Sequence, residues 1–121
     1  MTLELELPST TAAPARARGA LDEVAADLAP ERLGDVRLLV SELVTTAVRH
    51  AAGDVLRLVI ARRRGVLRVE VHDPGEGFEV SPPSPDPHRS SGWGLVLVDE
   101  LADRWGVDGT PRTRVWFEMA A

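Results

Sequence analysis

The sequence contains no cysteine and no lysine, so all fourteen of its basic side chains apart from histidine are arginines. The lack of cysteine excludes disulfides, zinc sites built from thiolates and cysteine nucleophiles. The lack of lysine excludes Schiff-base chemistry and the phosphate-binding loop that depends on a lysine. The composition alone therefore excludes several large enzyme classes.

The sequence also lacks a long apolar run. No window approaches the roughly 18 consecutive apolar residues of a membrane span. The first residues do not show the basic and then apolar pattern of a secretory signal. We therefore expect a soluble, cytoplasmic protein that does not associate with a membrane.

Positive charge is scarce as well, since the formal net charge is −5. Binding to nucleic acid needs clustered cations that neutralise phosphates. The one tight cluster is Arg62, Arg63 and Arg64, which precedes Gly65 between two strand-like stretches. We interpret it as a solvated hairpin tip and expect no direct contact with nucleic acid.

The length of 121 residues and the apolar content of 44% suit one domain, spanning residues 1–121, with a single core. Alternation of apolar residues predicts an edge strand at residues 3–8. Helical spacing predicts helices at residues 15–28 and 30–52, and Gly53 is a natural stop for the second.

The second half begins with a predicted antiparallel hairpin, with strands at residues 54–61 and 66–73. Residues 79–91 carry four prolines, which predicts a long loop of the kind that forms functional lids. A third helix is predicted after Gly94 and a last strand at residues 113–119, with one more strand possible at residues 105–108. This order predicts a two-layer α/β sandwich, in which helices cover one face of a mixed, mostly antiparallel sheet.

The helix at residues 30–52 has a broad apolar arc with a polar strip along its border. The arc contains Val36, Leu39, Val40, Leu43, Val44, Ala47 and Val48, and the strip contains Asp35, Glu42, Thr46 and Arg49. By itself, Glu42 is better explained as a solvated charge at the edge of the helix, paired with Arg49 or Arg32, than as a functional residue.

Two glycine-containing fragments lie at the ends of predicted elements. Gly92 and Gly94, in "GWG", open the third helix, where free N–H groups and the helix dipole favour phosphate. Asp73, in "DPGEG", has the acceptor that an exocyclic amine such as that of adenine needs, while Gly75 and Gly77 leave space for a flat ring. Each fragment alone is also ordinary turn chemistry, but together, separated by a predicted lid, they favour a nucleotide site.

Four blocks of the sequence, "SELVTTAVRHA", "VHDPGEGF", "GWGLVLVDELADRWG" and "TRVWFEM", occur in an order that resembles a known family. This is the ATPase superfamily of gyrase, Hsp90, histidine kinases and MutL. Within it, the chain is most similar to the small bacterial anti-sigma-factor serine kinases. The resemblance covers nearly the whole chain and implies that ATP and Mg²⁺ are held between the second helix, the two glycine fragments and the lid.

The resemblance also implies a role for each matched residue. Glu42 is similar to the catalytic base, and Asp73 to the aspartate that reads adenine. The remaining matches contact the nucleotide: Gly75 and Gly77 beneath the base, Gly92 and Gly94 beside the phosphates, and Thr113 near the adenine.

Two positions depart from the family pattern. Thr46 stands where the family has an asparagine whose amide oxygen ligates Mg²⁺, and its shorter side chain would reach the metal through a water. Pro74 replaces the asparagine that commonly follows the aspartate. We therefore expect nucleotide recognition to persist and metal binding and phosphoryl transfer to be weaker.

The three histidines and the three tryptophans are expected to be mainly structural. His50, His72 and His88 show no metal-ligand spacing and are predicted to lie on the surface or in the lid. Trp105 and Trp116 are predicted in the core, while Trp93, between two glycines, is a weaker candidate to pack over the nucleotide.

The sequence is compatible with three functions. The first is a serine kinase that sequesters a sigma factor and phosphorylates an anti-sigma-factor antagonist protein. The second is a binding module, catalytically weakened at Thr46, that acts through its partners alone. The third is a plain ATPase or the catalytic half of a histidine kinase. The sequence does not decide whether the domain forms a homodimer.

Overall fold

The computed structural model describes the chain except for residues 51–53, 74–92 and 109–113. It contains five strands and three helices in the described part. In chain order they are β1 (Thr2–Pro8), α1 (Ala13–Ala25), α2 (Pro30–His50), β2 (Val55–Arg63), β3 (Val66–His72), α3 (Trp93–Leu101), β4 (Arg104–Asp108) and β5 (Arg114–Ala120). The predicted order of elements is confirmed, including the additional strand before the last one.

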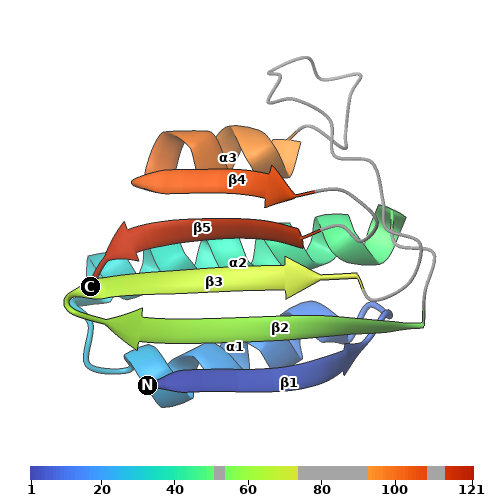
Figure 1. Cartoon of the computed structure of the whole chain (residues 1–121), viewed down its shortest axis with the longest axis horizontal. Helices are drawn as coiled ribbons and strands as arrows, with labels where there is room; N and C mark the ends of the chain where they lie inside the picture. The colour runs from blue at the N-terminus through green and yellow to red at the C-terminus, as the bar shows by residue number, and fades with distance from the viewer. Residues whose placement is uncertain (51–53, 74–92, 109–113) are drawn as a thin grey trace.

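The five strands form one sheet in the order β1-β2-β3-β5-β4. All four pairings are antiparallel, so the sheet is antiparallel throughout the described residues rather than mixed. β1 is an edge strand, as predicted, and β4 forms the other edge. The helices lie on one face of the sheet, with α2 between α1 and α3 (Figure 1). This is the predicted two-layer sandwich.

The core lies between the helices and the inner face of the sheet. Alternate residues of β2, β3 and β5 point into it, as strand geometry requires. These inner residues are Leu56, Leu58, Ile60, Leu67, Val69, Val71, Val115, Phe117 and Met119, all buried.

None of the helices described is long and apolar enough to cross a membrane.

The apolar arc predicted for the second helix forms the main contact of α2 with the sheet. Six members of the arc, from Val36 to Ala47, are buried, and Val48 is partly buried against the core. Glu42 and Thr46 are half-buried and lie at the border of the arc, as predicted. The helix begins at Pro30 as predicted, because proline is suited to the first turn.

The turn between β2 and β3 is the predicted hairpin, and its two central residues, Arg64 and Gly65, both have positive φ. This pattern is typical of the tight turns that match the twist of antiparallel strands. Arg63 and Arg64 are exposed, as expected for a hairpin tip. Arg62 differs from the prediction of a solvated tip. Its guanidinium reaches α1 and donates hydrogen bonds to Asp27 and to the carbonyl of Val24.

Trp116 also differs from the prediction, because it lies on the open face of the sheet rather than in the core. Its neighbours Val115 and Phe117 point inward, so Trp116 points outward. The guanidinium carbon of Arg68 lies 4.1 Å from the centre of the Trp116 ring. On β4, the ring covers Gly106, where a Cβ would lie 2.8 Å from it. Trp105 is partly buried against the core, closer to what was predicted.

Candidate functional site

Several elements that carry predicted site residues meet at one end of the sandwich. The register aligns the end of β3 with the start of β5 and the end of β4, through His72, Arg114 and Asp108. The C-terminal end of α2 and the first turn of α3 lie at this same end (Figure 1). The topology therefore brings together Asp73, the helix that carries Glu42 and the helix that follows the second glycine fragment.

Asp73 directly follows β3 and is completely buried. It is the one charged side chain among the described residues that is buried to this degree. Burying a carboxylate is costly unless polar partners compensate. Asp73 is therefore the described residue that we take as the candidate for recognising a ligand at this end of the sheet.

Glu42 and Thr46 lie one turn apart on α2 and therefore on the same side of it. The preceding residue, Ser41, faces α1, because its Oγ accepts a hydrogen bond of 2.8 Å from Nη1 of Arg18. Successive helical residues differ by about 100°, so Glu42 is turned away from α1, toward the side of α2 on which α3 lies. The two oxygen-bearing side chains thus face the space between α2 and α3.

Gly94 lies in the first turn of α3, which begins at Trp93. At a helix N-terminus, free N–H groups and the helix dipole favour an anion. The N-terminus of α3 is at the same end of the sandwich as the end of β3, which Asp73 follows (Figure 1). The element predicted to bind phosphate therefore lies at the end of the sheet that carries the other described site candidates.

Four predicted residues, Gly75, Gly77, Gly92 and Thr113, lie outside the described residues. The same holds for Pro74, for the proline-rich segment predicted as a lid, and for His88. The described part of the site consists of Asp73, Glu42, Thr46 and the start of α3.

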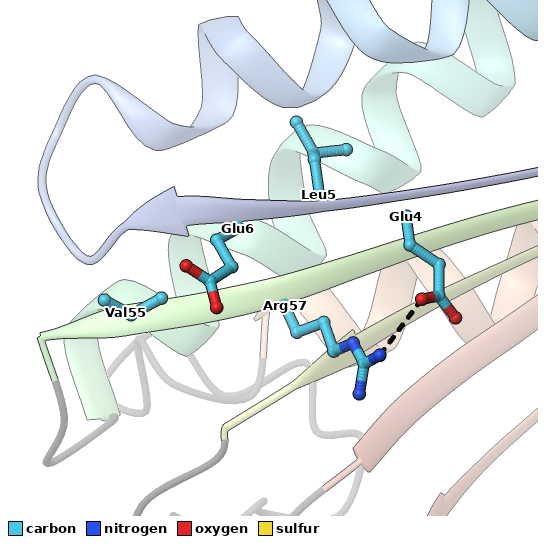
Figure 2. A pocket seen from close by; sticks show the side chains of 5 residues that line it. All are labelled: Glu4, Leu5, Glu6, Val55 and Arg57. Atoms are coloured by element: carbon cyan, nitrogen blue, oxygen red, sulfur yellow. Dashed lines mark hydrogen bonds and ion pairs between the residues drawn. The ribbon is translucent and has the colours of Figure 1, made fainter.

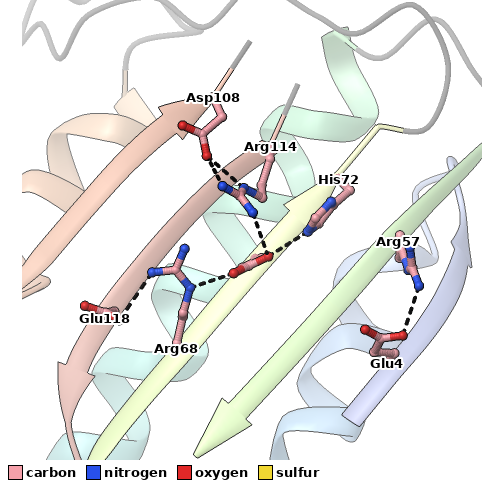
Figure 3. Close-up of polar contacts among 8 residues, drawn as sticks. Glu4, Arg57, Arg68, His72, Asp108, Arg114 and Glu118 are labelled. Atoms are coloured by element: carbon pink, nitrogen blue, oxygen red, sulfur yellow. Dashed lines mark hydrogen bonds and ion pairs between the residues drawn. The ribbon is translucent and has the colours of Figure 1, made fainter. Parts of the chain in front are cut away.

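A polar network that the sequence analysis did not identify supports the end of β3 (Figure 3). Its centre is Glu70, which accepts hydrogen bonds of 2.6 Å from Nε of Arg68 and 2.7 Å from Nε2 of His72. Arg114 lies 3.9 Å from Glu70 and bonds to Asp108 at the end of β4. His72, predicted to be a surface histidine, is thus half-buried in a network that joins three strands immediately before Asp73.

The network fixes the charge of Glu70. Burial by itself would raise the pKa of the Glu70 carboxyl, but hydrogen bonds from Arg68 and His72 outweigh it and hold the pKa below its usual value of 4.5. In the same network, the hydrogen bond to Asp108 raises the pKa of Arg114. The alternation of charged residues at positions 68, 70 and 72 was the signal that could have predicted this cluster.

A hollow of about 510 Å³ lies elsewhere, over β1 and β2. Glu4, Glu6 and Arg57 line it from the open face of the sheet, and Arg57 pairs with Glu4 at 3.0 Å (Figure 2). None of the predicted site residues contributes to it. We therefore do not assign it to the nucleotide.

The comparison with protein families identifies the fold. The model of the histidine kinase-like ATPase domain matches residues 7–119. The chain belongs to this family. No curated protein matches the sequence significantly. Membership supports ATP binding by this domain.

The residues of the ATPase domain also fit the Mg²⁺ that the family usually binds with ATP. The described residues contain no cluster of three or more histidine or acidic side chains that could hold a metal. Mg²⁺ commonly keeps several waters and takes one or two protein oxygens plus phosphates, so it needs no such cluster. Thr46 provides one such oxygen, which would reach the metal through a water, on the same side of α2 as Glu42.

The lowered pKa of Glu70 predicts how Glu70→Gln changes stability. Ionised Glu70 stabilises the fold above pH 4.5, and this contribution is lost as the pH falls through the lowered pKa. We expect the variant to be less stable at neutral pH by about 1 kcal/mol and the difference to shrink in acid. Urea unfolding at several pH values measures this.

The matched control is Glu4→Gln, which alters the exposed pair with Arg57 and is expected to change stability much less. A difference between wild type and Glu70→Gln that stays constant from neutral to acidic pH would contradict the assigned network.

Proposed function

We propose that the protein is an ATP-dependent serine kinase that switches between two protein partners, a sigma factor and an anti-sigma-factor antagonist. The observation that carries the nucleotide part is the complete burial of Asp73 at the end of β3, in a domain of the ATPase family. The kinase and partner parts are supported by the sequence resemblance given above.

In this proposal Asp73 recognises the base. Its carboxylate accepts a hydrogen bond from the exocyclic amine of adenine, at a position where guanine carries a carbonyl oxygen instead. A buried acceptor that is left without a matching donor is costly, which gives selectivity for adenine. The start of α3 interacts with the phosphates through its N–H groups and dipole.

Glu42 acts on the nucleophile. It accepts the proton of the serine hydroxyl of the antagonist as that oxygen bonds to the γ-phosphorus, and ADP leaves with the electrons of the broken bond. Mg²⁺, when bound, offsets the charge on the phosphate oxygens. The packing of α2 on the sheet holds the Glu42 carboxylate on the side of the helix that faces α3.

Thr46 favours a second candidate function, a module that binds nucleotide and partners without efficient transfer. A threonine hydroxyl leaves from Cβ, one atom earlier than the amide oxygen of asparagine, and reaches a metal through a water. Weaker metal binding lowers the rate of phosphoryl transfer and leaves the recognition of adenine intact. The two candidates differ only in whether the γ-phosphate is transferred.

Asp73→Asn tests how the base is read. The amide can present a donor where an acceptor is needed, so ATP affinity is expected to fall by about 1–3 kcal/mol. GTP binding is expected to be weak in both proteins and to change little. Isothermal titration with both nucleotides measures this, and an equal loss for ATP and GTP would show that the base is read elsewhere.

Thr46→Asn tests the metal site. Restoring the longer oxygen donor is expected to increase ATP affinity in the presence of Mg²⁺ by on the order of tenfold, and to leave the affinity without Mg²⁺ unchanged. Thr45→Asn is the matched control, because Thr45 lines a separate hollow with Thr10 and Pro14. An affinity for Mg²⁺-ATP that does not respond to Thr46→Asn would reject this role.

Transfer of radiolabelled γ-phosphate to a candidate antagonist protein separates the kinase from the binding module. We expect transfer by the wild type and a reduction of about 10²- to 10⁴-fold in Glu42→Gln, with ATP affinity retained. Transfer that is absent in the wild type and in Thr46→Asn, despite ATP binding, would favour the binding module.

A further inference from the structure

The corner of the sheet at the β2–β3 turn carries an unusual concentration of positive charge. A groove of about 440 Å³ on this corner is lined by eight residues. Four of them are arginines and only one is acidic: Arg63, Arg64, Arg68, Arg104 and Glu118. The corner is therefore strongly basic in a chain whose formal net charge is −5. We call it the arginine groove.

The single glutamate does not neutralise the groove. Glu118 accepts a hydrogen bond of 3.2 Å from Nη1 of Arg68 and lies 3.5 Å from Nη1 of Arg104. The Arg104 side chain nevertheless remains 75% exposed. No acidic side chain of the described residues forms an ion pair with Arg63 or Arg64. Three guanidinium groups are thus available to a ligand at the rim of the groove.

Turn chemistry does not explain the arginine at position 64. The residue has a φ of 51°, a left-handed conformation that favours glycine, asparagine or aspartate at this place in a hairpin. Left-handed backbone costs an ordinary side chain about 1–2 kcal/mol. An arginine stands there although a smaller residue would suit the turn better, which is consistent with a role for its charge.

We propose that the arginine groove is a docking site for a short acidic segment of a protein partner. Charge complementarity supports an anionic ligand. Val66, which lines the groove and is 40% exposed, supplies apolar contact of the kind that a peptide can use. The small extent of the basic patch on an acidic protein disfavours a long polyanion such as nucleic acid, because phosphates beyond the patch would meet negative charge.

The groove is separate from the nucleotide site. The arginine groove lies at the start of β3, and Asp73 follows its other end, seven residues along. At about 3.3 Å per residue this is roughly 20 Å. Docking can therefore be tested without nucleotide. A negative docking result would not bear on the proposed kinase activity.

The test uses a short fluorescent peptide rich in glutamate with two leucines, and a matched peptide in which lysine replaces every glutamate. The glutamate peptide is expected to bind saturably and the lysine peptide not to bind. The variant Arg63→Glu with Arg104→Glu reverses two exposed charges at the rim and is expected to weaken binding by about tenfold or more. Arg63→Gln with Arg104→Gln should give an intermediate loss.

The matched control is Arg16→Glu with Arg37→Glu, which makes the same change in net charge on the helical side of the molecule and should leave affinity unchanged. Equal weakening by both pairs of charge reversals would show a non-specific effect and overturn the proposal. Absence of binding to the wild type would also overturn it. Tighter binding of a single-stranded oligonucleotide through the same arginines would replace the protein partner by nucleic acid.

Discussion

The packing of one side of α2 against the inner face of the sheet is the constraint on which the site depends. The helix buries a continuous arc from Val36 to Ala47, so it cannot rotate without exposing apolar surface. This fixes the direction of Glu42 and Thr46, which lie at the border of the arc. Because interiors are densely packed, such a contact also limits translation of the helix. The same apolar contact that stabilises the domain therefore positions the two side chains for which we propose roles toward the nucleophile and the metal.

The strand β3, at the centre of the sheet, is likewise held in place on both of its faces. Its inner residues Val69 and Val71 belong to the core, and its outer residues Glu70 and His72 belong to the polar network of the open face. Asp73 follows directly and is buried. With one face fixed by packing and the other by hydrogen bonds, the strand leaves little freedom to the residue that ends it. Rigid support of this kind is what the recognition role proposed for Asp73 requires.

The sequence predicted the fold well because its signals were periodic. The alternation at residues 66–72 and the helical arc of α2 directly reflect which side of each element is buried. The open face was predicted poorly. Trp116 was predicted to lie in the core. In the structure it lies on the outer face, where the guanidinium of Arg68 stacks over its ring. Its outward direction follows from the alternation along β5, where Val115 and Phe117 point inward. What the sequence could not show is that Gly106, on a strand paired across the sheet, lies opposite the ring.

The residues of the candidate site could be named from the sequence, but their arrangement could not. Motifs placed Glu42 and Asp73 on elements that the topology brings to one end of the sandwich, which no local pattern could show. The network around Glu70 was missed because it joins side chains from three strands. The arginine cluster was interpreted as solvated, and only the structure showed that Arg62 contacts α1 while Arg63 and Arg64 join Arg68 and Arg104 around a groove.

The most direct test of the account is an ATP titration of the isotope-labelled protein followed by backbone amide resonances. We predict that the amides of Val71, His72 and Asp73 and those of Glu42 to Thr46 shift together and saturate, while those of the β2–β3 turn do not. Saturable shifts confined to other elements, or no response to ATP at all, would contradict the assignment of a nucleotide to this end of the sheet.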